Sequence, residues 1–392
     1  MASDRTRLLV VDDTAMNRDI LSRRLTRKGY DVTCAVDGRD ALEQVGRQSF
    51  ALVLLDIMMP GIDGMEVLRI LRRTHGPTQL PVIMATAKEQ SEDIVQALHD
   101  GANDYVTKPI DFPVLLARIE THVGLKRATE ALDESYRRIK MDLDAAARIQ
   151  HALLPTSVPD NPGVRIAWRY EPCDELAGDI LNVFELDGEH LGLYLLDVSG
   201  HGVQAALLSS AIRHVLSSTS EDGSVVKDRA EGNAPPRMVP PAEVAHRLNR
   251  RFPLDQSTAQ YFTILYGILD LAEKNFQYVP AGHPGPLVLT ADGDAAIHER
   301  TGFPIGFVED PDYGHDLIEL HAADRVYLYS DGIVEAANAD REAYGRERLI
   351  EMARQTRPQS LEESLSVLLQ SVQDWTEGQP QDDVSILAFE IA

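Results

Sequence analysis

Short apolar runs alternate with amphipathic stretches through roughly the first 120 residues of the chain. The runs that fit buried strands are residues 8–11, 32–36, 52–55, 82–85 and 105–106. The stretches with helical periodicity between them lie near residues 16–28, 39–47, 64–73 and 91–100. Short strands that alternate with helices are typical of a parallel, doubly wound α/β sheet. In such a sheet, ligands bind at the carboxyl ends of the strands.

A heptad pattern follows between residues 119 and 154. Apolar side chains recur every seven positions, at Leu125, Leu132, Ile139, Ala146 and Leu153, and Tyr136 and Leu143 add a partial second stripe. The pattern predicts one long helix with coiled-coil character and favours a parallel homodimer through it. The alternative is a linker helix that packs on its own domains. Pro155 and Pro159 end the helix.

Strand patterns dominate the remainder of the chain. Strands are expected near residues 164–170, 183–186, 191–196, 262–271, 275–279, 286–289, 325–329 and 384–390. Helices are expected near residues 202–218, 241–252, 344–354 and 361–375, and residues 219–240 are rich in Ser, Gly, Pro and charge, as in a mobile loop. The pattern predicts an α+β domain, an antiparallel β-sandwich flanked by helices. We therefore expect three parts, with residues 6–122 as the first domain, 123–155 as the helical linker and 156–392 as the second domain.

Charge and composition narrow the classes of partner. The formal net charge is −24, which argues against non-specific nucleic-acid binding and against an anionic membrane surface. Cys34 and Cys173 lie in different predicted domains and fit neither a disulfide framework nor a zinc site. The chain has no signal-peptide pattern and no apolar run of about 20 residues. We expect a cytoplasmic protein without a nucleic-acid or membrane partner.

One group of polar residues lies at the predicted strand ends of the first domain. Its members are Asp12, Asp13, Asp56, Thr86 and Lys108. Asp12 and Asp13 suit a divalent cation, and Asp56 suits a nucleophilic carboxylate that forms an acyl phosphate. Lys108 would neutralise the phosphoryl oxygens, and the Thr86 hydroxyl would donate a hydrogen bond to one of them.

A second group of aspartates lies near strand ends of the second domain. Its members are Asp179, Asp197, Asp331, Asp382 and Asp383, with Gly178, Gly200, Gly202 and Gly332 beside them. Carboxylates from separate strands can hold two metal ions about 4 Å apart and activate a bridging water. Ser199 and His201 would suit a serine hydrolase, but the G-x-S-x-G spacing of a nucleophile elbow is absent.

The first domain resembles the receiver domain of response regulators. The matching segments are LLVVDD, LLDIMMPGIDG, MATA and GANDYVTKPID. The resemblance implies that Asp56 is the phosphoacceptor, that Thr86 and Tyr105 form a switch pair, and that the carbonyl of Met58 is a further Mg²⁺ ligand. A sensor histidine kinase would be the phosphoryl donor. A flavodoxin-like domain with incidental acidic residues is the alternative.

The second domain resembles the SpoIIE-like branch of the PPM family of protein serine/threonine phosphatases. The matching segments are ARIQHALLP, AGD, DVSGHGVQAALL, FTILYGILD, AGHPGP, GFPIGF, YSDGIVEA and QDDVSIL. The resemblance implies two Mn²⁺ or Mg²⁺ ions, held by Asp179, Asp197, Asp331, Asp382 and the carbonyl of Val198, with Asp383 behind Asp382. Ala177 and the run Ile180-Leu181-Asn182 depart from the usual pattern beside the carboxylates.

These observations predict a response regulator whose output is a metal-dependent phosphatase, controlled through Asp56. The resemblance implies a phosphoserine or phosphothreonine substrate on an anti-sigma-factor antagonist. The alternative is a non-catalytic, phosphatase-like adaptor, which loss of metal carboxylates would mark. A DNA-binding regulator has little support, because no recognition helix with a basic face follows residue 122. His283 is expected to be structural, with phosphate orientation as the alternative.

Overall fold

The computed structural model describes residues 6–87, 91–155, 158–159, 161–200, 202–217, 224–228, 237–254, 260–300, 302–378 and 381–392. The chain folds as two compact units, Met1–Lys140 and Met141–Ala392. The division falls within helix α5 (Phe112–His151), so each unit contains part of this helix.

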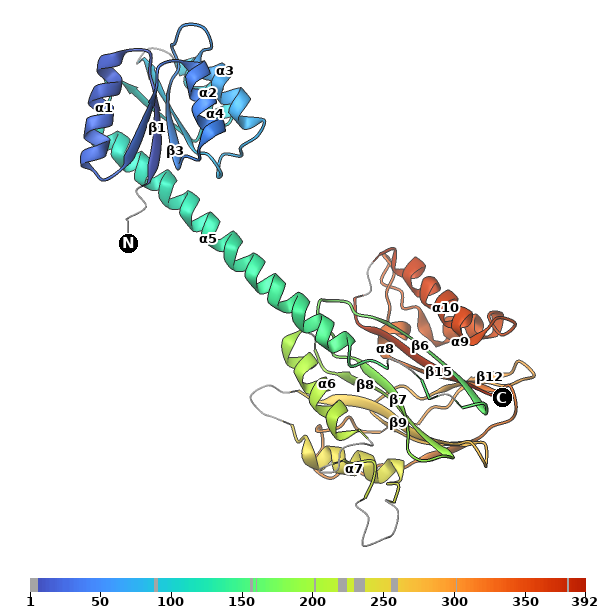
Figure 1. Cartoon of the computed structure of the whole chain (residues 1–392). Coiled ribbons are helices and arrows are strands. Elements are labelled where there is room, and N and C mark those ends of the chain that lie inside the picture. The colour runs from blue at the N-terminus through green and yellow to red at the C-terminus, as the bar shows by residue number, and fades with distance from the viewer. Residues whose placement is uncertain are drawn as a thin grey trace. The chain divides into compact units, whose positions relative to one another are not determined.

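The first unit contains a five-stranded parallel sheet with strand order β2-β1-β3-β4-β5 (Figure 1). The strands are β1 (Arg7–Val11), β2 (Asp31–Ala35), β3 (Leu52–Asp56), β4 (Val82–Ala87) and β5 (Asp104–Lys108). The helices between them are α1 (Ala15–Arg27), α2 (Gly38–Arg47), α3 (Gly64–Arg72) and α4 (Ser91–His99). The predicted doubly wound α/β fold is confirmed.

Helices cover both faces of this sheet because the strands are apolar on both sides. Leu21 of α1 and Ile119 of α5 are buried in one core with β1, β3 and β4. Val67 of α3 and Ala97 of α4 are buried in a second core on the opposite face. Figure 1 shows α1 on one side and α2, α3 and α4 on the other. With both faces covered by helices, Asp12, Asp56 and Lys108 lie at the carboxyl ends of β1, β3 and β5.

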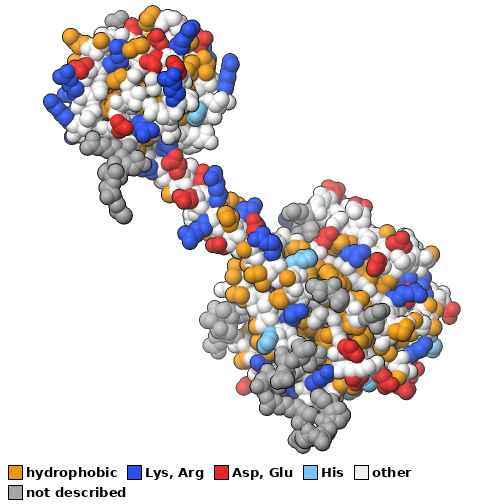
Figure 2. Space-filling model, viewed as in Figure 1, with side chains coloured by type: hydrophobic (Ala, Val, Ile, Leu, Met, Phe, Trp, Pro, Cys, Tyr) orange, Lys and Arg blue, Asp and Glu red, His pale blue; other side chains and the backbone are white. Residues whose placement is uncertain are grey.

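Helix α5 begins earlier than the heptad pattern suggested. It starts at Phe112, directly after β5, and its first turns bury Leu115, Ile119 and Val123 against the first unit. The predicted start of the helix near residue 119 is wrong, because the helix already begins within the predicted first domain, where its first turns pack into the core of the first unit. Residues 128 and 130–142 are exposed, and Figure 2 shows Lys, Arg, Asp and Glu side chains interspersed along this helix.

The second unit contains two five-stranded sheets whose strand pairs are all antiparallel. One has the order β13-β10-β9-β8-β7 and the other the order β12-β11-β14-β15-β6. Their bounds are β6 (Val164–Glu171), β7 (Ile180–Glu185), β8 (His190–Val198), β9 (Phe262–Asp270), β10 (Asn275–Ala281), β11 (Leu287–Leu289), β12 (Ala295–Ile297), β13 (Asp316–Glu319), β14 (Arg325–Tyr329) and β15 (Val384–Ile391). The helices are α6 (Val203–Val215), α7 (Pro241–Arg251), α8 (Asp331–Val334), α9 (Gly345–Gln355) and α10 (Leu361–Thr376). The predicted α+β sandwich is confirmed.

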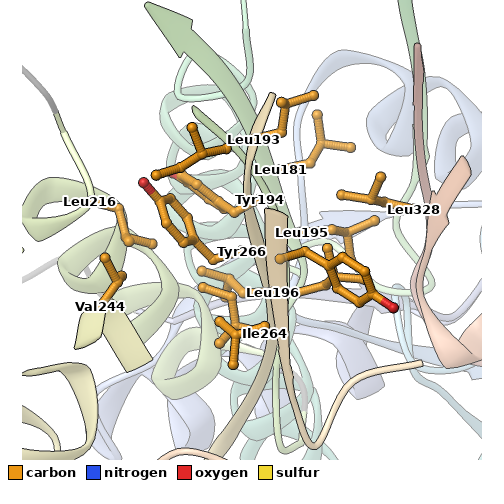
Figure 3. Close-up of a cluster of buried hydrophobic side chains, with 14 of the residues drawn as sticks. Leu181, Leu193, Tyr194, Leu195, Leu196, Leu216, Val244, Ile264, Tyr266 and Leu328 are labelled. Atoms are coloured by element: carbon orange, nitrogen blue, oxygen red, sulfur yellow. The ribbon is translucent and has the colours of Figure 1, made fainter. Parts of the chain in front are cut away.

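The sandwich has a continuous apolar core. Figure 3 shows Leu216 and Val244 on one side of strands β8 and β9 and Leu328, from β14 of the other sheet, on the opposite side. Tyr194 and Tyr266 are directly opposite each other across β8 and β9 and are fully buried. A separate core joins the second sheet to α9 and α10. The apolar core between the two sheets thus holds the sandwich together.

We expected a mobile loop at residues 219–240, and this expectation is wrong for the parts of it that the structure describes. Val225, Val226 and Val239 are buried in the main core of the unit, and Val239 N–H donates to the carbonyl oxygen of Val226 at 3.0 Å. These parts are packed because their three valines are apolar. Residues 219–223 and 229–236 lie outside the described residues. Among the described helices, none combines the length and the apolar character that a membrane span requires.

Candidate functional site

Three carboxylates gather at the carboxyl edge of the sheet in the first unit. Asp12 and Asp13 follow β1 and Asp56 ends β3, and these two strands are parallel neighbours. One oxygen from each carboxylate lies within 4.8 Å of the others, a spacing that suits one divalent ion. An all-oxygen ligand set is what Mg²⁺ and Mn²⁺ prefer. We refer to Asp12, Asp13, Asp56 and Lys108 as the first site.

Lys108 supplies the positive charge of the first site. Its Nζ atom lies 2.6 Å from Oδ2 of Asp56 and 2.9 Å from Oδ2 of Asp12. Burial raises the pKa of Asp56, and the hydrogen bond from Lys108 opposes that shift. Burial would lower the pKa of Lys108, but the two carboxylates raise it above its ordinary value. The amine therefore stays protonated and holds both carboxylates in place.

Backbone and amide donors also fix Asp12. The N–H of Thr14 donates to Oδ1 of Asp12 at 2.9 Å, and Nδ2 of Asn17 donates to both carboxylate oxygens at 3.1 Å. The N–H of Met58 lies 3.4 Å from Oδ1 of Asp56, so the turn that carries the Met58 carbonyl is adjacent to the site. Asp13 is exposed and accepts from the Thr14 hydroxyl at 3.2 Å.

Thr86 and Tyr105 lie on adjacent strands next to this site. Thr86 is buried on β4 and is paired in register with Thr107, the neighbour of Lys108. Tyr105 is half-buried on β5, and the guanidinium of Arg118 lies over its ring at 5.6 Å. Arg118 belongs to α5, so this ring contacts the helix that continues into the second unit.

The second group of aspartates comes from four segments of the second unit. Asp179 precedes β7 and Asp197 lies near the end of β8, both in the first sheet of the sandwich. Asp331 is the first residue of α8, and Asp382 and Asp383 precede β15. The N–H of Gly178 donates to Oδ2 of Asp383 at 2.8 Å, which joins the segments of the two sheets directly. We refer to the five aspartates as the second site.

The carboxylates of the second site repel one another. Asp179 is buried, and burial followed by the charges of Asp197 and Asp383 raises its pKa well above the ordinary value. Burial, Asp331 and Asp382 raise the pKa of Asp197 to about 7. Among the described residues, no Lys or Arg forms an ion pair with Asp179, Asp197 or Asp331. A divalent cation would supply the missing positive charge.

Asp382 and Asp383 have different surroundings. Asp383 is buried and accepts from the backbone N–H groups of Cys173 at 2.9 Å, Gly178 at 2.8 Å and Asp179 at 3.4 Å. Asp382 is exposed, as an ion ligand at the mouth of a site would be. This difference favours Asp382 as the ligand and Asp383 as the residue that shapes the segment before Asp179.

Gly178 is required by a close backbone approach. A Cβ atom at this position would lie 2.6 Å from the carbonyl oxygen of Val198 and 3.1 Å from that of Gly200. The segment of Asp179 therefore packs directly on the segment that follows Asp197. Ser199 binds Tyr261 through two hydrogen bonds, its N–H donating to the Tyr261 carbonyl and its hydroxyl accepting from the Tyr261 N–H, both at 3.0 Å. This pairing makes Ser199 a strand-edge residue, and His201 lies outside the described residues.

His283 is buried, and it forms no ion pair within the described part of the chain. Its Nδ1 atom donates to the Pro284 carbonyl oxygen at 3.1 Å, and Nε2 is buried with no hydrogen bond among the described residues. Burial lowers the pKa of His283 to about 4. The side chain is therefore neutral at pH 7.

Two comparisons of the sequence with known families cover both units. Residues 8–120 match the family described as response regulator receiver domain. Residues 187–392 match the family described as Stage II sporulation protein E (SpoIIE). The second match spans more than half of the chain and includes the carboxylates of Asp197, Asp331, Asp382 and Asp383. The chain belongs to the SpoIIE family. Its first unit is a receiver domain, and its second unit is a SpoIIE-type phosphatase domain with the PPM fold.

Solved structures share the fold of the SpoIIE-type unit. The SiaA-PP2C domain of Pseudomonas aeruginosa is 20% identical with a TM-score of 0.54, and the match covers 66% of this chain and 99% of that one. The RsbU and RsbW domains of a Mycobacterium tuberculosis protein are 27% identical with a TM-score of 0.50. That match covers 61% of this chain and 63% of the other, so this chain spans less than two thirds of it.

Sequence reasoning missed three residues at the second site. The thiol of Cys173 lies within 4.8 Å of carboxylate oxygens of Asp382 and Asp383, although the sequence assigned this cysteine to no site. The hydroxyl of Ser385 donates to Oδ2 of Asp179 at 2.5 Å. Gln150, at the end of α5, is hydrogen-bonded to Ala177. These contacts join residues far apart in sequence, so only the position of Ser385 two residues after Asp383 gave any signal.

Proposed function

We propose that this chain is a two-component response regulator whose output is a metal-dependent serine/threonine protein phosphatase. The observation that carries the proposal is the presence of two separate carboxylate sites in one chain. The first site has its own cation, Lys108, whereas in the described part of the chain no Lys or Arg forms an ion pair with Asp179, Asp197 or Asp331. Residues 6–122 would form the receiver, 123–155 the linker and 156–392 the phosphatase.

Asp56 is the proposed phosphoacceptor of the receiver. One of its oxygens would attack the phosphorus of a phosphohistidine on a sensor histidine kinase, forming an O–P bond as the N–P bond breaks. Lys108 is already within hydrogen-bond distance of Asp56, and its amine would form an ion pair with the phosphoryl oxygens once they are bound to Asp56. Thr86 would donate its hydroxyl to one of those oxygens. Asp12, Asp13 and the Met58 carbonyl would hold Mg²⁺.

The second site would hydrolyse a phosphoserine or phosphothreonine. Asp179, Asp197, Asp331, Asp382 and the Val198 carbonyl would hold two Mn²⁺ or Mg²⁺ ions. When bound, the ions supply Lewis-acid stabilisation and a water of lowered pKa. Asp383 keeps the Asp179 segment in place through three backbone N–H groups. We propose a phosphorylated anti-sigma-factor antagonist as the substrate, in line with the SpoIIE family.

Helix α5 is the proposed coupling element between the sites. Leu125, Leu132 and Ile139 repeat every seven residues and are 55%, 69% and 56% exposed in the single chain. A second copy of the chain would cover this apolar stripe in a parallel coiled coil, so we propose a homodimer. Phosphorylation of Asp56 would change the receiver's contacts with α5 and thereby bias the phosphatase.

A phosphate-release assay tests the enzyme. Purified protein with Mn²⁺ is expected to hydrolyse p-nitrophenyl phosphate and a phosphoserine protein, and Asp197→Ala should abolish both activities. Asp292→Ala, which removes an exposed aspartate from a turn, is the matched control and should leave both rates unchanged. A wild-type protein that is inert with both Mn²⁺ and Mg²⁺ would contradict the enzyme and leave the adaptor in its place.

Beryllofluoride tests the coupling separately. It mimics an acyl phosphate on Asp56, so the phosphatase rate should change when it is added and Asp56→Asn should remove the response. Asp19→Asn, an exposed receiver aspartate, should respond like wild type. Equal rates with and without beryllofluoride in wild type would contradict the coupling while leaving the enzyme intact.

A further inference from the structure

The last turns of α5 are hydrogen-bonded to the segment that carries Asp179. Nε2 of Gln150 donates to the carbonyl oxygen of Ala177 at 2.7 Å, and the N–H of Ala177 donates to Oε1 of Gln150 at 3.2 Å. Gln150 is 8% exposed and Ala177 is fully buried. One side-chain amide thus satisfies both backbone groups of Ala177, which fixes the position and the rotation of that residue.

The segment around Ala177 connects several parts of the second site. The carbonyl of Leu176 accepts from the N–H of Gly202, at the start of α6, at 3.2 Å. The N–H groups of Gly178 and Asp179 donate to Asp383. Ala177 lies between these anchored residues, and its own backbone is anchored by Gln150. A displacement of Ala177 would therefore move Asp179 relative to the carboxylates of the other segments.

Gln150 also lies on a stripe of the heptad pattern. It follows Leu143 by seven residues and Tyr136 by fourteen, so it occupies the second, partial stripe of α5. Its side chain is buried, whereas the neighbouring Ile149 is 68% exposed. Just beyond α5, Leu154 is buried in the core of the sandwich and anchors the end of the helix. A rotation or shift of α5 would thus act on Gln150 directly.

We propose that Gln150 is a positioning residue that holds Asp179 in its metal-binding position, so that the end of α5 sets the metal affinity of the second site. The proposal rests on the proposed function, because it takes Asp179 as a metal ligand. The hydrogen bonds between Gln150 and Ala177 would then be the contact through which α5 acts on the phosphatase site. Gln150 touches neither the substrate nor an ion, and it acts through the backbone of Ala177 alone.

Two substitutions separate the hydrogen bonds from side-chain size. Gln150→Met keeps the length of the side chain but leaves the N–H and C=O of Ala177 without the amide, and unsatisfied buried backbone groups are destabilising. Gln150→Glu keeps the acceptor for the Ala177 N–H but places a carboxylate against the Ala177 carbonyl. Ser364→Ala is the matched control. This buried serine is hydrogen-bonded to Tyr327 and Thr356, and neither residue is a proposed metal ligand.

The experiment measures Mn²⁺ binding by isothermal titration calorimetry in the full chain. Every protein carries Asp12→Asn and Asp13→Asn, so that binding reports the second site. Gln150→Met and Gln150→Glu should weaken Mn²⁺ binding about tenfold or more, the scale seen when residues that orient metal ligands are replaced. Without metal, amide hydrogen exchange at Ala177 should be faster in Gln150→Met, which lacks the acceptor for this N–H. Ser364→Ala should change the thermal midpoint but neither of these readouts.

Activity adds a second readout that a purely structural role would not produce. The Mn²⁺ concentration for half-maximal phosphate release should rise in Gln150→Met, while the rate at saturating Mn²⁺ approaches that of wild type. Unchanged or tighter Mn²⁺ binding in Gln150→Met would overturn the inference and leave the proposed function standing. A wild-type second site that binds no Mn²⁺ would instead contradict the proposed function itself.

Discussion

In the receiver site, Lys108 lies between Asp12 and Asp56, whereas in the phosphatase site the buried carboxylates of Asp179 and Asp197 face other carboxylates. Both sites collect aspartates at strand ends, and both suit hard divalent cations. They differ in how the charge is balanced without an ion. The receiver carries its own counter-charge, whereas among the described residues no Lys or Arg forms an ion pair with Asp179, Asp197 or Asp331 of the phosphatase site.

This difference fits the two kinds of chemistry that we propose. A switch must be stable both before and after it receives a phosphoryl group, and a built-in lysine can pair with Asp56 in one state and with the phosphoryl oxygens in the other. A hydrolase with two ions needs a high density of negative charge to hold them. Repulsion between Asp179 and Asp197 in the metal-free protein is the physical consequence of that density.

Both sites also depend on a glycine next to the backbone of an aspartate segment. A Cβ atom on Gly64 would lie 2.1 Å from the carbonyl oxygen of Asp56, and one on Gly178 would lie 2.6 Å from that of Val198. Backbone atoms cannot move aside as the end of a flexible side chain can. The comparison therefore separates what the sites share, close backbone packing, from what distinguishes them, the balance of charge.

The largest expected effect is that of Gly178→Ala on the phosphatase. The added methyl would push the Asp179 segment away from Val198, and displacements of about 1 Å at a catalytic site cost roughly a hundredfold in rate. We expect Mn²⁺-dependent phosphate release to fall by about that factor or more, with near-native circular dichroism. Gly188→Ala is the control, since a Cβ atom there meets nothing within 4 Å. A Gly178→Ala enzyme with normal Mn²⁺ dependence would refute the close-packing argument.

Lys108→Met removes the positive charge that is paired with Asp12 and Asp56 in the receiver site. Removing one partner of a fully buried ion pair costs roughly 3–5 kcal/mol. Because 29% of the Lys108 side chain is exposed, we expect a smaller loss of unfolding free energy, about 2 kcal/mol. Urea unfolding followed by hydrogen exchange in receiver peptides measures this loss at pH 7.

Saturating Mg²⁺ should restore most of the stability that Lys108→Met removes, because the ion replaces the lost charge. Wild type should gain less from Mg²⁺, since Nζ of Lys108 already binds Asp12 and Asp56. Arg69→Met removes a more exposed partner of Asp100 and is the control, with a change of about 0.5 kcal/mol. Equal responses to Mg²⁺ in wild type and Lys108→Met would show that Lys108 is not the internal counter-charge.

A buried histidine extends the comparison to pH. His122 in the receiver is partly exposed and lies 3.3 Å from the carboxylate of Asp104, whereas His283 in the phosphatase is buried and, among the described residues, has one hydrogen bond, from Nδ1 to a carbonyl oxygen. The pKa of His283 is lowered to about 4 from 6.5, so its contribution to stability is present above about pH 6.5 and is lost as the pH falls toward 4. At pH 5 the loss is about 2 kcal/mol, at 1.36 kcal/mol per pH unit.

The raised pKa values of Asp179 and Asp197 act in the opposite direction, since protonation of these carboxyls stabilises the metal-free fold at low pH. The difference between wild type and His283→Gln isolates the histidine. Both tryptophans, Trp168 and Trp375, belong to the second unit, so tryptophan fluorescence follows its unfolding. If the unfolding free energies of wild type and His283→Gln changed in parallel between pH 7 and pH 5, that result would contradict a buried, neutral His283.

Local pattern predicted the fold because each apolar run in the receiver becomes one strand of the sheet. It also placed Asp12, Asp56 and Lys108 at strand ends, and the parallel sheet brings such ends together without further information. Strand ends and flanking glycines also marked Asp331 and Asp382 as candidates, and the resemblance to known families assigned them as metal ligands. No periodicity encodes their approach across two sheets. The assignment of ligand roles to these residues stays a prediction.

Other features could not be derived from the sequence because they depend on contacts between distant segments. The link from Gln150 to Ala177 spans 27 positions, and Cys173 meets Asp383 across 210. The early start of α5 was missed because its first turns pack on the receiver core and break the heptad pattern. The buried valines within residues 219–240 were missed because the many Ser, Gly and charged residues around them made the whole segment resemble an exposed loop.

The smallest expected change in unfolding free energy tests the charge argument most directly. Asp197→Asn should abolish phosphate release and yet raise the unfolding free energy of the metal-free second unit, because it removes one carboxylate from a group that repels itself. We expect a gain of about 1 kcal/mol at pH 7.5, measured by tryptophan fluorescence in urea with a chelator present. Asp324→Asn is the control, since this buried aspartate accepts from the N–H groups of Ala291 and His321 and its replacement should destabilise the unit. A destabilised Asp197→Asn protein in the absence of metal would mean that the second site is not under electrostatic strain, and the contrast with the receiver site would not hold.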